Sequence, residues 1–483
     1  MSADRNGAGT GPGTATVVGS GPNGLAAAVA LAREGWTVTI HEAAERIGGG
    51  TRTEALTLPG FLHDVCSAVH PMGAGSPFFR TLPLADHGLE WIPPPVLMAH
   101  PLDDGTATAL LPSVSDTAAT LGPDAAAYRR LMDPLVPRWK ELFDDALGPP
   151  LRVPRHPILM ARLGLRGLRS ATGLARSAFE GPRARAFFMG LAAHTLLPLD
   201  RVPTAAFGFM LGLAGHGPGW PIPRGGSRSI AGALAALLRE HGGRILTESA
   251  VENVDDLPAT DAVLLDLTPR QVLEVAGHRL PDRYRTRLRD YRYAPGAFKL
   301  DWALSEPIPW TAPECRSAGT MHLGGSAEAI VRSADAAWHG RDDDHPYVLV
   351  AQPSLFDPSR APEGRHTAWA YCHVPHGDTR DRTAAIEGQV ERFAPGFRDT
   401  ILARSTMNTR ELEAHNPNLV GGDINGGLAD LRQFLFRPVP TLDPYATPDP
   451  MLFLCSASTP PGGGVHGMCG WHAARSVMKR NAR

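Results

Sequence analysis

Residues 15–42 read ATVVGSGPNGLAAAVALAREGWTVTIHE, and this stretch decides the fold. A short apolar run at residues 15–18 leads into a glycine-rich turn, and the Ala- and Leu-rich residues 25–33 follow with the pattern of a helix. A second strand-like run occupies residues 37–40. The stretch therefore predicts a compact strand–helix–strand unit, the building block of an α/β sheet.

The turn in this unit has the spacing G-x-G-x-x-G. Gly19 permits the tight turn, Gly21 lets the backbone approach a pyrophosphate, and Gly24 lets helix and strand pack closely. The start of the helix adds amide donors and a partial positive charge. Glu42 follows the second strand, where an acidic side chain can hold a pair of ribose hydroxyls. These features predict a dinucleotide site and leave FAD and NAD both open.

Residues 42–53, which read EAAERIGGGTRT, choose between the two cofactors. An acidic residue followed by Arg, a glycine pair and a polar/basic pair resembles the start of the flavin amine oxidase and phytoene desaturase superfamily. In that superfamily, the second glycine-rich turn brings backbone amides to the FAD diphosphate. Such a turn supplies donors for a ligand longer than one nucleotide. The resemblance implies that the cofactor is FAD.

Two later segments match the same superfamily in the same order. Residues 223–227 (PRGGS) and 242–246 (GGRIL) with Val251 resemble its middle block, where the backbone at the position of Val251 contacts the adenine side. Residues 454–467 (LCSASTPPGGGVHG) resemble its C-terminal flavin motif. The resemblance implies FAD contacts from Gly19, Gly21, Pro22, Asn23, Gly24, Glu42, Gly48, Gly49, Thr51, Arg52, Val251, Ser458, Gly463, Gly464 and Val465.

Shorter motifs narrow the resemblance to the phytoene desaturase-like branch, which includes carotenoid desaturases, retinol saturase and pyridine nucleotide-disulphide oxidoreductase domain-containing proteins. They are residues 352–354 (QPS), 357–360 (DPSR), 362–364 (PEG), 421–424 (GGDI) and 437–438 (RP). Many relatives carry His where this chain has Pro460, so any role of that His is lost here. A disulphide reductase needs a reactive cysteine pair and a second G-x-G-x-x-G, and the sequence has neither.

The resemblance implies an α/β fold in which a Rossmann-like FAD-binding domain is interleaved with a mixed α/β substrate domain. We expect the FAD-binding domain to comprise residues 14–75, 215–275 and 445–483, and the substrate domain residues 76–214 and 276–444. The implied function is that of a FAD-dependent oxidoreductase. Our preferred reaction is hydride transfer between flavin N5 and a substrate carbon, which desaturates or saturates a C–C bond of an apolar, polyene-like or isoprenoid-like substrate.

Other functions are compatible with the same motifs. One is flavin-dependent isomerisation or reductive cyclisation of a secondary metabolite, and another is a non-catalytic scaffold that holds FAD. His466 lies inside the C-terminal flavin motif and is the candidate acid, base or charge partner near the ring, or equally a cap of the loop. Further candidates for the pocket wall are His70, Trp220, His322, Gln433 and Arg437, although apolar neighbours favour a structural role for each one taken singly. The electron acceptor and the oligomeric state are left open by these residues.

The composition of the chain bears on nucleic-acid partners, metal sites and the cellular compartment. The net charge of -2 and 20% charged residues are ordinary for a globular protein and indicate no nucleic-acid partner. Five scattered cysteines and the absence of zinc spacing predict no metal site and fit a reducing cytoplasm. The first 13 residues lack the pattern of a secretory signal and are expected to form a loose tail.

One stretch suggests a contact with a membrane surface. Residues 151–188 carry eight arginines against one glutamate, interleaved with leucine and methionine. Such a pattern is typical of an interfacial helix on anionic lipid, and equally of a solvated basic face over an ordinary core. We therefore expect a location in the cytoplasm, with peripheral membrane contact through residues 151–188 as one alternative.

Overall fold

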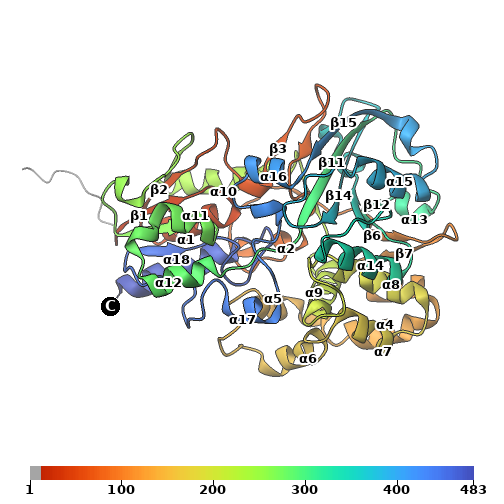
Figure 1. Ribbon diagram of the computed structural model, residues 1–483, viewed down its shortest axis with the longest axis horizontal. Coiled ribbons are helices and arrows are strands. Elements are labelled where there is room, and N and C mark those ends of the chain that lie inside the picture. Colours follow the sequence, from red (N-terminus) through yellow and green to blue (C-terminus); the bar gives the residue numbers. More distant parts are fainter. Residues whose placement is uncertain (1–11, 483) are drawn as a thin grey trace, which may run out of the picture.

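The structure, a computed structural model, describes residues 12–482. The expected N-terminal tail lies almost wholly outside these residues. Two large sheets and a group of helices form most of the molecule, and segments from the early, middle and late parts of the described chain lie side by side around β1 (Thr14–Val18), β2 (Thr37–His41), α10 (Arg228–Glu240) and α18 (Met468–Asn481) (Figure 1).

The first sheet has five strands in the order β16-β10-β1-β2-β9, and every neighbouring pair is parallel. β1 and β2 are the two strands predicted from residues 15–42, and α1 connects them. The strands are β1 (Thr14–Val18), β2 (Thr37–His41), β9 (Arg244–Leu246), β10 (Ala262–Leu265) and β16 (Leu452–Leu454). This parallel sheet confirms the predicted Rossmann-like fold.

Three helices pack around the parallel sheet: α1 (Pro22–Arg33), α10 (Arg228–Glu240) and α18 (Met468–Asn481). α1 contacts both of the others, and all of its residues from Asn23 to Ala32 are buried. Its alanines permit this, because small side chains let helices approach closely. Helices α11 (Pro269–Ala276) and α12 (Asp282–Arg289) follow β10.

The second sheet has seven strands in the order β15-β11-β14-β13-β12-β6-β7, of which only the β12–β6 pair is parallel. β11, which pairs with β14 and β15, is buried along its whole length. The strands are β6 (Val96–Pro101), β7 (Ala107–Leu110), β11 (Gly296–Leu304), β12 (Ala318–Leu323), β13 (Val348–Ala351), β14 (His366–Val374) and β15 (Ile401–Met407).

Helices α3 to α9 form a layer below the second sheet in Figure 1. They are α3 (Val114–Thr120), α4 (Ala125–Met132), α5 (Trp139–Ala146), α6 (Pro157–Gly167), α7 (Ala171–Ala178), α8 (Pro182–Ala192) and α9 (Thr204–His216). α9 contacts α6, α7 and α8, and α8 contacts α14 (Ala327–Trp338). This layer and the second sheet come from the two ranges expected for the substrate domain, and the domain boundaries stay a prediction.

The remaining elements are short or lie at the edges. The helices are α2 (Pro71–Ala74), α13 (Pro313–Arg316), α15 (Thr383–Phe393), α16 (Thr409–His415) and α17 (Leu431–Phe436). The strands pair as β3 (Thr53–Glu54) with β4 (His63–Asp64), and β5 (Trp91–Ile92) with β8 (Ile222–Pro223). Within residues 12–482, no helix is both long and apolar enough to span a bilayer.

The crossing of α1 and α18 gives the first prediction. A Cβ at Gly470 would lie 1.8 Å from the Asn23 carbonyl oxygen, so Gly470→Ala forces the two helices apart. Overpacking of this kind costs about 1–3 kcal/mol, and we expect a lower Tm in thermal unfolding. The control is Gly232→Ala on α10, where nothing lies within 4 Å of the added atom, so Tm should hold or rise. Equal Tm values for the two variants would contradict the proposed packing.

Candidate functional site

A cavity of about 1360 Å³ opens at the carboxyl ends of the five parallel strands. The residues that follow these strands and line the cavity are Gly19 after β1, Glu42 after β2, Ser249 after β9, Asp266 after β10 and Ser456 after β16. Ligands of open α/β sheets bind at this edge, because the strands there end in loops and helix N-termini. The cavity continues from this edge toward the second sheet, where Leu349 and Trp369 line it.

The glycine turn is built for close approach. Gly19 has a φ of +99°, which side-chain-bearing residues rarely adopt. A Cβ at Gly24 would lie 2.1 Å from the Gly19 carbonyl oxygen, and a Cβ at Gly49 would lie 3.2 Å from the Gly21 Cα. The two glycine-rich turns therefore meet at Gly21 and Gly49, and both of these residues line the cavity. Side chains at Gly24 and Gly49 would collide with the backbone of Gly19 and Gly21 and force the two turns apart.

Glu42 is held rigidly at the end of β2. Its Oε2 accepts a hydrogen bond from the Ser20 amide at 2.9 Å, and its Oε1 accepts from the Ala44 amide at 3.0 Å and from Arg52 at 3.2 Å. Oε2 also accepts from the Ser20 hydroxyl at 2.5 Å, so the roughly four acceptor positions of a carboxylate are all occupied. Because Glu42 lines the cavity, a ribose hydroxyl can take the place of the Ser20 hydroxyl, which is free to rotate away.

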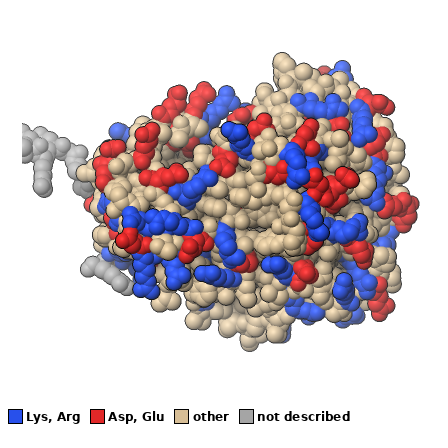
Figure 2. All heavy atoms as spheres, in the orientation of Figure 1, with Lys and Arg blue, Asp and Glu red and all other residues tan. Residues whose placement is uncertain are grey.

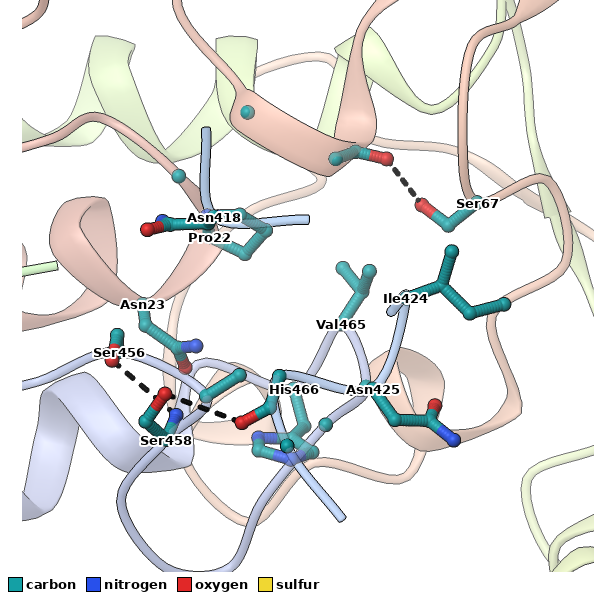
Figure 3. A pocket seen from close by; sticks show the side chains of 18 of the residues that line it. Pro22, Asn23, Ser67, Asn418, Ile424, Asn425, Ser456, Ser458, Val465 and His466 are labelled. Carbon is teal, nitrogen blue, oxygen red and sulfur yellow. Dashed lines mark hydrogen bonds between the residues drawn. The ribbon is translucent and has the colours of Figure 1, made fainter. Parts of the chain in front are cut away.

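Most of the sequence-predicted cofactor residues line this single cavity. These are Gly19, Gly21, Pro22, Asn23, Glu42, Gly49, Arg52, Val251, Ser458, Gly463, Gly464 and Val465. The first and last motifs face one hollow in Figure 3, where Asn23, Val465 and His466 are labelled. Gly24, Gly48 and Thr51 lie behind the wall, where Thr51 Oγ1 donates to the Gly48 carbonyl at 2.7 Å. Their individual contacts with FAD stay a prediction.

The polar atoms of the wall fit a dinucleotide. Asn23 Oδ1 is buried without a hydrogen-bond partner among the described residues, at the start of α1. The first-turn amides of a helix have no partner within the helix and favour an anion. Backbone amides of the two glycine turns would hold the diphosphate of FAD, because phosphate oxygens only accept hydrogen bonds. Asn23 Oδ1, itself an acceptor, would take a donor group of the cofactor, and Glu42 the ribose hydroxyls.

His466 lies in the cavity wall as a neutral imidazole. Its Nδ1 accepts a hydrogen bond from the Met468 amide at 3.0 Å, which places the ring proton on Nε2. Burial lowers the pKa of His466 to about 4, against a smaller opposite effect of the Gly463 and Gly462 backbone. At neutral pH this side chain is therefore uncharged. Its role as a catalytic group stays a prediction.

Asp266 is a wall residue that the sequence reading missed. Its Oδ2 accepts from the Gly24 amide at 2.9 Å, so it braces the glycine turn from β10. Burial raises the pKa of Asp266 to about 7, and the hydrogen bond from Gly24 opposes this shift while Glu42 adds to it. The signal in the sequence is the acid that ends the apolar run at residues 262–265.

A buried charged cluster was also missed. Lys299 of β11 lines the cavity, and its Nζ pairs with Asp301. The other oxygen of Asp301 lies 3.6 Å from His63 Nδ1, and His63 Nε2 lies 2.8 Å from Thr57 Oγ1. Burial raises the pKa of Asp301 to about 6 and lowers the pKa of His63 to about 3. The signal in the sequence was a lysine and an aspartate two residues apart in an otherwise apolar strand, because residues at that spacing share one face.

Three of the five further wall candidates line the cavity, namely His70, Trp220 and Arg437. His322 does not, because it lies behind His194, with the two Nε2 atoms 3.0 Å apart. His194 lines the cavity in its place. Gln433 is also absent from the wall, since its Oε1 accepts from the Arg292 amide at 2.8 Å and its amide group donates to nearby carbonyls. These two residues therefore have the structural role that their apolar neighbours favour and do not line the cavity.

A model of the family described as flavin containing amine oxidoreductase matches residues 23–477. The chain belongs to this family. It is a FAD-dependent oxidoreductase, and the relatives confirm the resemblance to phytoene desaturases.

Pyridine nucleotide-disulfide oxidoreductase domain-containing protein 2 of Rattus norvegicus is 26% identical over 96% of this chain and 93% of that protein. Phytoene desaturase (neurosporene-forming) of Rhodobacter capsulatus is 25% identical over 95% of this chain and 92% of that protein. Among solved structures, an oxidoreductase from Methanosarcina mazei has a TM-score of 0.66 at 16% identity, covering 96% of this chain and 100% of the other. Wild-type putrescine oxidase bound to putrescine has a TM-score of 0.62 at 16% identity, covering 98% and 99%. These two structures support the fold.

Glu42 gives the second prediction. Glu42→Ala removes the ribose acceptor, and the loss of a charge-assisted hydrogen bond of about 1.5–3 kcal/mol should raise the Kd for FAD about 10- to 100-fold. The measurement is fluorescence titration of the apoprotein with FAD. Glu252→Ala is the matched control, because Glu252 lines the same cavity at an exposed position and carries the same charge. If Glu42→Ala kept the wild-type Kd, the ribose assignment would be wrong.

Asp266 gives a pH-dependent prediction. Its pKa rises from 3.8 to about 7 on folding, so the folded state holds the proton more tightly than the unfolded chain. Stability should therefore fall as pH rises across this interval, and level off above it. Asp266→Asn keeps an acceptor for the Gly24 amide and removes the free-energy cost of burying a charged carboxylate. The Tm advantage of the variant apoprotein should grow between about pH 5 and pH 8, whereas Asp256→Asn, at an exposed position, should show none. A pH-independent difference would refute the raised pKa.

Proposed function

We propose that this enzyme desaturates or saturates C–C bonds of an apolar, polyene-like or isoprenoid-like substrate. The observation that carries the proposal is the chemistry of the cavity beyond the dinucleotide end. Apolar side chains dominate the wall there, contributed by the second sheet and by helices α6 and α9. They are Met160, Leu163, Phe207, Met210, Leu211, Leu349 and Trp369.

The charges at this end argue against an amine substrate. A cationic amine needs a carboxylate partner when it leaves water. Among the described residues of this part of the wall the carboxylate is Asp145, and its two oxygens accept from the backbone amides of Arg155 and His156 at 2.9 and 2.8 Å. Lys299 adds an amine of the same sign as the substrate. An uncharged hydrocarbon meets neither difficulty.

The size of the cavity argues against a purely structural cofactor. Pockets for one drug-sized ligand measure about 300–1,000 Å³, and this cavity reaches about 1360 Å³. The space therefore accommodates a substrate beside FAD, which side chains would fill if the cofactor served only as a scaffold. The surrounding apolar walls exclude water from the reacting carbons.

Several polar and aromatic residues at this end have roles in the proposed reaction. FAD, when bound, supplies hydride transfer. Lys299 holds a proton at Nζ beside the cavity, and Asp301 fixes the direction of that amine. Burial lowers the pKa of His194 to about 3, so its imidazole is neutral and can accept or donate a hydrogen bond. Trp369 and Tyr371, whose ring centroids lie 5.1 Å apart, provide flat surfaces for a conjugated substrate.

Anaerobic mixing of the holoenzyme with polyenes, isoprenoids and putrescine, monitored by flavin absorbance and product mass, tests the reaction class. With oxidised flavin we expect bleaching and a product lighter by two hydrogens if the enzyme desaturates. With flavin reduced beforehand by dithionite, we expect flavin reoxidation and a product heavier by two hydrogens if the enzyme saturates. A product of unchanged mass would favour isomerisation. Bleaching by putrescine alone would overturn the proposal.

Met210 tests where the substrate lies. Met210→Glu places a charge in the apolar wall, and kcat/KM for the hydrocarbon should fall at least about tenfold, since loss of an apolar contact and burial of a carboxylate both oppose binding. Met210→Leu conserves volume and should stay close to wild type. The flavin spectrum should be the same in both variants. Unchanged kcat/KM in Met210→Glu would place the substrate elsewhere.

A further inference from the structure

Exposed apolar side chains gather at the mouth of the cavity. Of the twelve large apolar residues that are exposed within residues 12–482, seven lie in two segments, 151–168 and α17, which shows a local concentration. They are Leu151, Val153, Ile158, Leu165, Leu168, Leu431 and Phe436. Val153 is 88% exposed, Ile158 72% and Leu165 79%. We call these seven residues, with the arginines between them, the entrance face.

The entrance face is continuous with the cavity. On α6, Ile158 and Leu165 point to solvent, whereas Met160 and Leu163 line the cavity. On α17, Phe436 is exposed and the two residues before it, Phe434 and Leu435, line the cavity. Both helices lie at the lower edge of the molecule in Figure 1. An apolar molecule can therefore pass from the entrance face to the interior along apolar side chains.

Basic side chains without acidic partners surround these apolar residues. Arg155, Arg162 and Arg432 are exposed, and none of them forms an ion pair with a described residue. Residues 151–169 contain no Asp or Glu. Around the lower edge in Figure 2, blue side chains border an area of mainly tan atoms. Apolar residues beside unpaired arginines suit the boundary between lipid headgroups and acyl chains.

Two arginines of the basic stretch at residues 151–188 are used within the protein and do not belong to the entrance face. Arg183 donates to the carbonyls of Thr120 and Ala107, and Arg185 donates to the carbonyl of Phe179. These two arginines therefore brace the helical layer. The exposed apolar residues of this stretch end at Leu168, and α17, far along the chain, completes the face.

We propose that the entrance face docks the enzyme on an anionic lipid surface, from which the apolar substrate enters the cavity. The substrate part rests on the proposed function, and the docking does not. Self-association through the same face is opposed by charge. In a two-fold dimer each surface meets itself, which would bring the unpaired arginines together without acids to balance them. Anionic headgroups supply the missing charges.

Sedimentation of the holoprotein with vesicles tests docking without any substrate. We expect binding to phosphatidylcholine vesicles that contain phosphatidylglycerol, weak binding to phosphatidylcholine alone, and release as salt rises from about 0.1 to 0.5 M. Arg155→Gln/Arg162→Gln should weaken binding about tenfold or more. Arg283→Gln/Arg287→Gln, on the exposed side of α12, removes the same charge elsewhere and should bind as wild type.

The apolar contribution is tested by Ile158→Ser/Leu165→Ser, which should also lose vesicle binding while the flavin spectrum and Tm stay unchanged. Leu246→Ser/Leu402→Ser, at two exposed leucines elsewhere, is the control. Failure of the wild-type protein to sediment with anionic vesicles would overturn docking and leave the proposed reaction to its own test. Light scattering that showed a dimer, dissociated by Ile158→Ser/Leu165→Ser, would assign the face to a second copy of the chain instead.

Discussion

The close crossing of α1 and α18 determines the geometry of the dinucleotide end. Gly470 brings α18 against the carbonyl of Asn23, and Gly24 brings the same turn against Gly19. These contacts fix the N-terminus of α1 at the carboxyl edge of the sheet, where Pro22 and Asn23 line the cavity. Glu42 and Asp266 then hold the glycine turn from the neighbouring strands. An alanine-rich helix is required here because bulkier side chains would separate the layers.

The cavity joins two chemical environments in one space. Backbone amides, glycines and carboxylates surround the dinucleotide end, whereas aromatic and aliphatic side chains surround the far end. Lys299 lies in this wall, with its charge balanced by Asp301 behind it. Such an arrangement keeps a polar cofactor and an apolar ligand in contact without burying an unpaired charge. The exposed apolar residues of α6 extend the second environment to the surface.

The parts of the site that are encoded locally could be predicted from the sequence. The turn at Gly19 and the position of Glu42 follow from spacing within one strand–helix–strand unit, since left-handed φ angles and strand ends leave local signatures. Contacts between residues that are far apart in the sequence left no such local signature. Arg360 pairs with Asp64 at 2.7 Å across 296 residues. His194 stands in front of His322 because α8 packs against β6, the strand next to β12. No local sequence pattern indicates which of the two histidines faces the cavity.

The strand order has a consequence for synthesis on the ribosome. β1, made first, occupies the middle of the parallel sheet, whereas β16, made last, pairs only with β10. Until residues 452–454 emerge, the growing chain presents β10 as an open, apolar edge, which is prone to pair with other chains. The loop that carries Gly463 and His466 is made later still. The flavin-motif loop is therefore complete only when nearly the whole polypeptide has been made, and the apolar β10 edge stays unpaired until then.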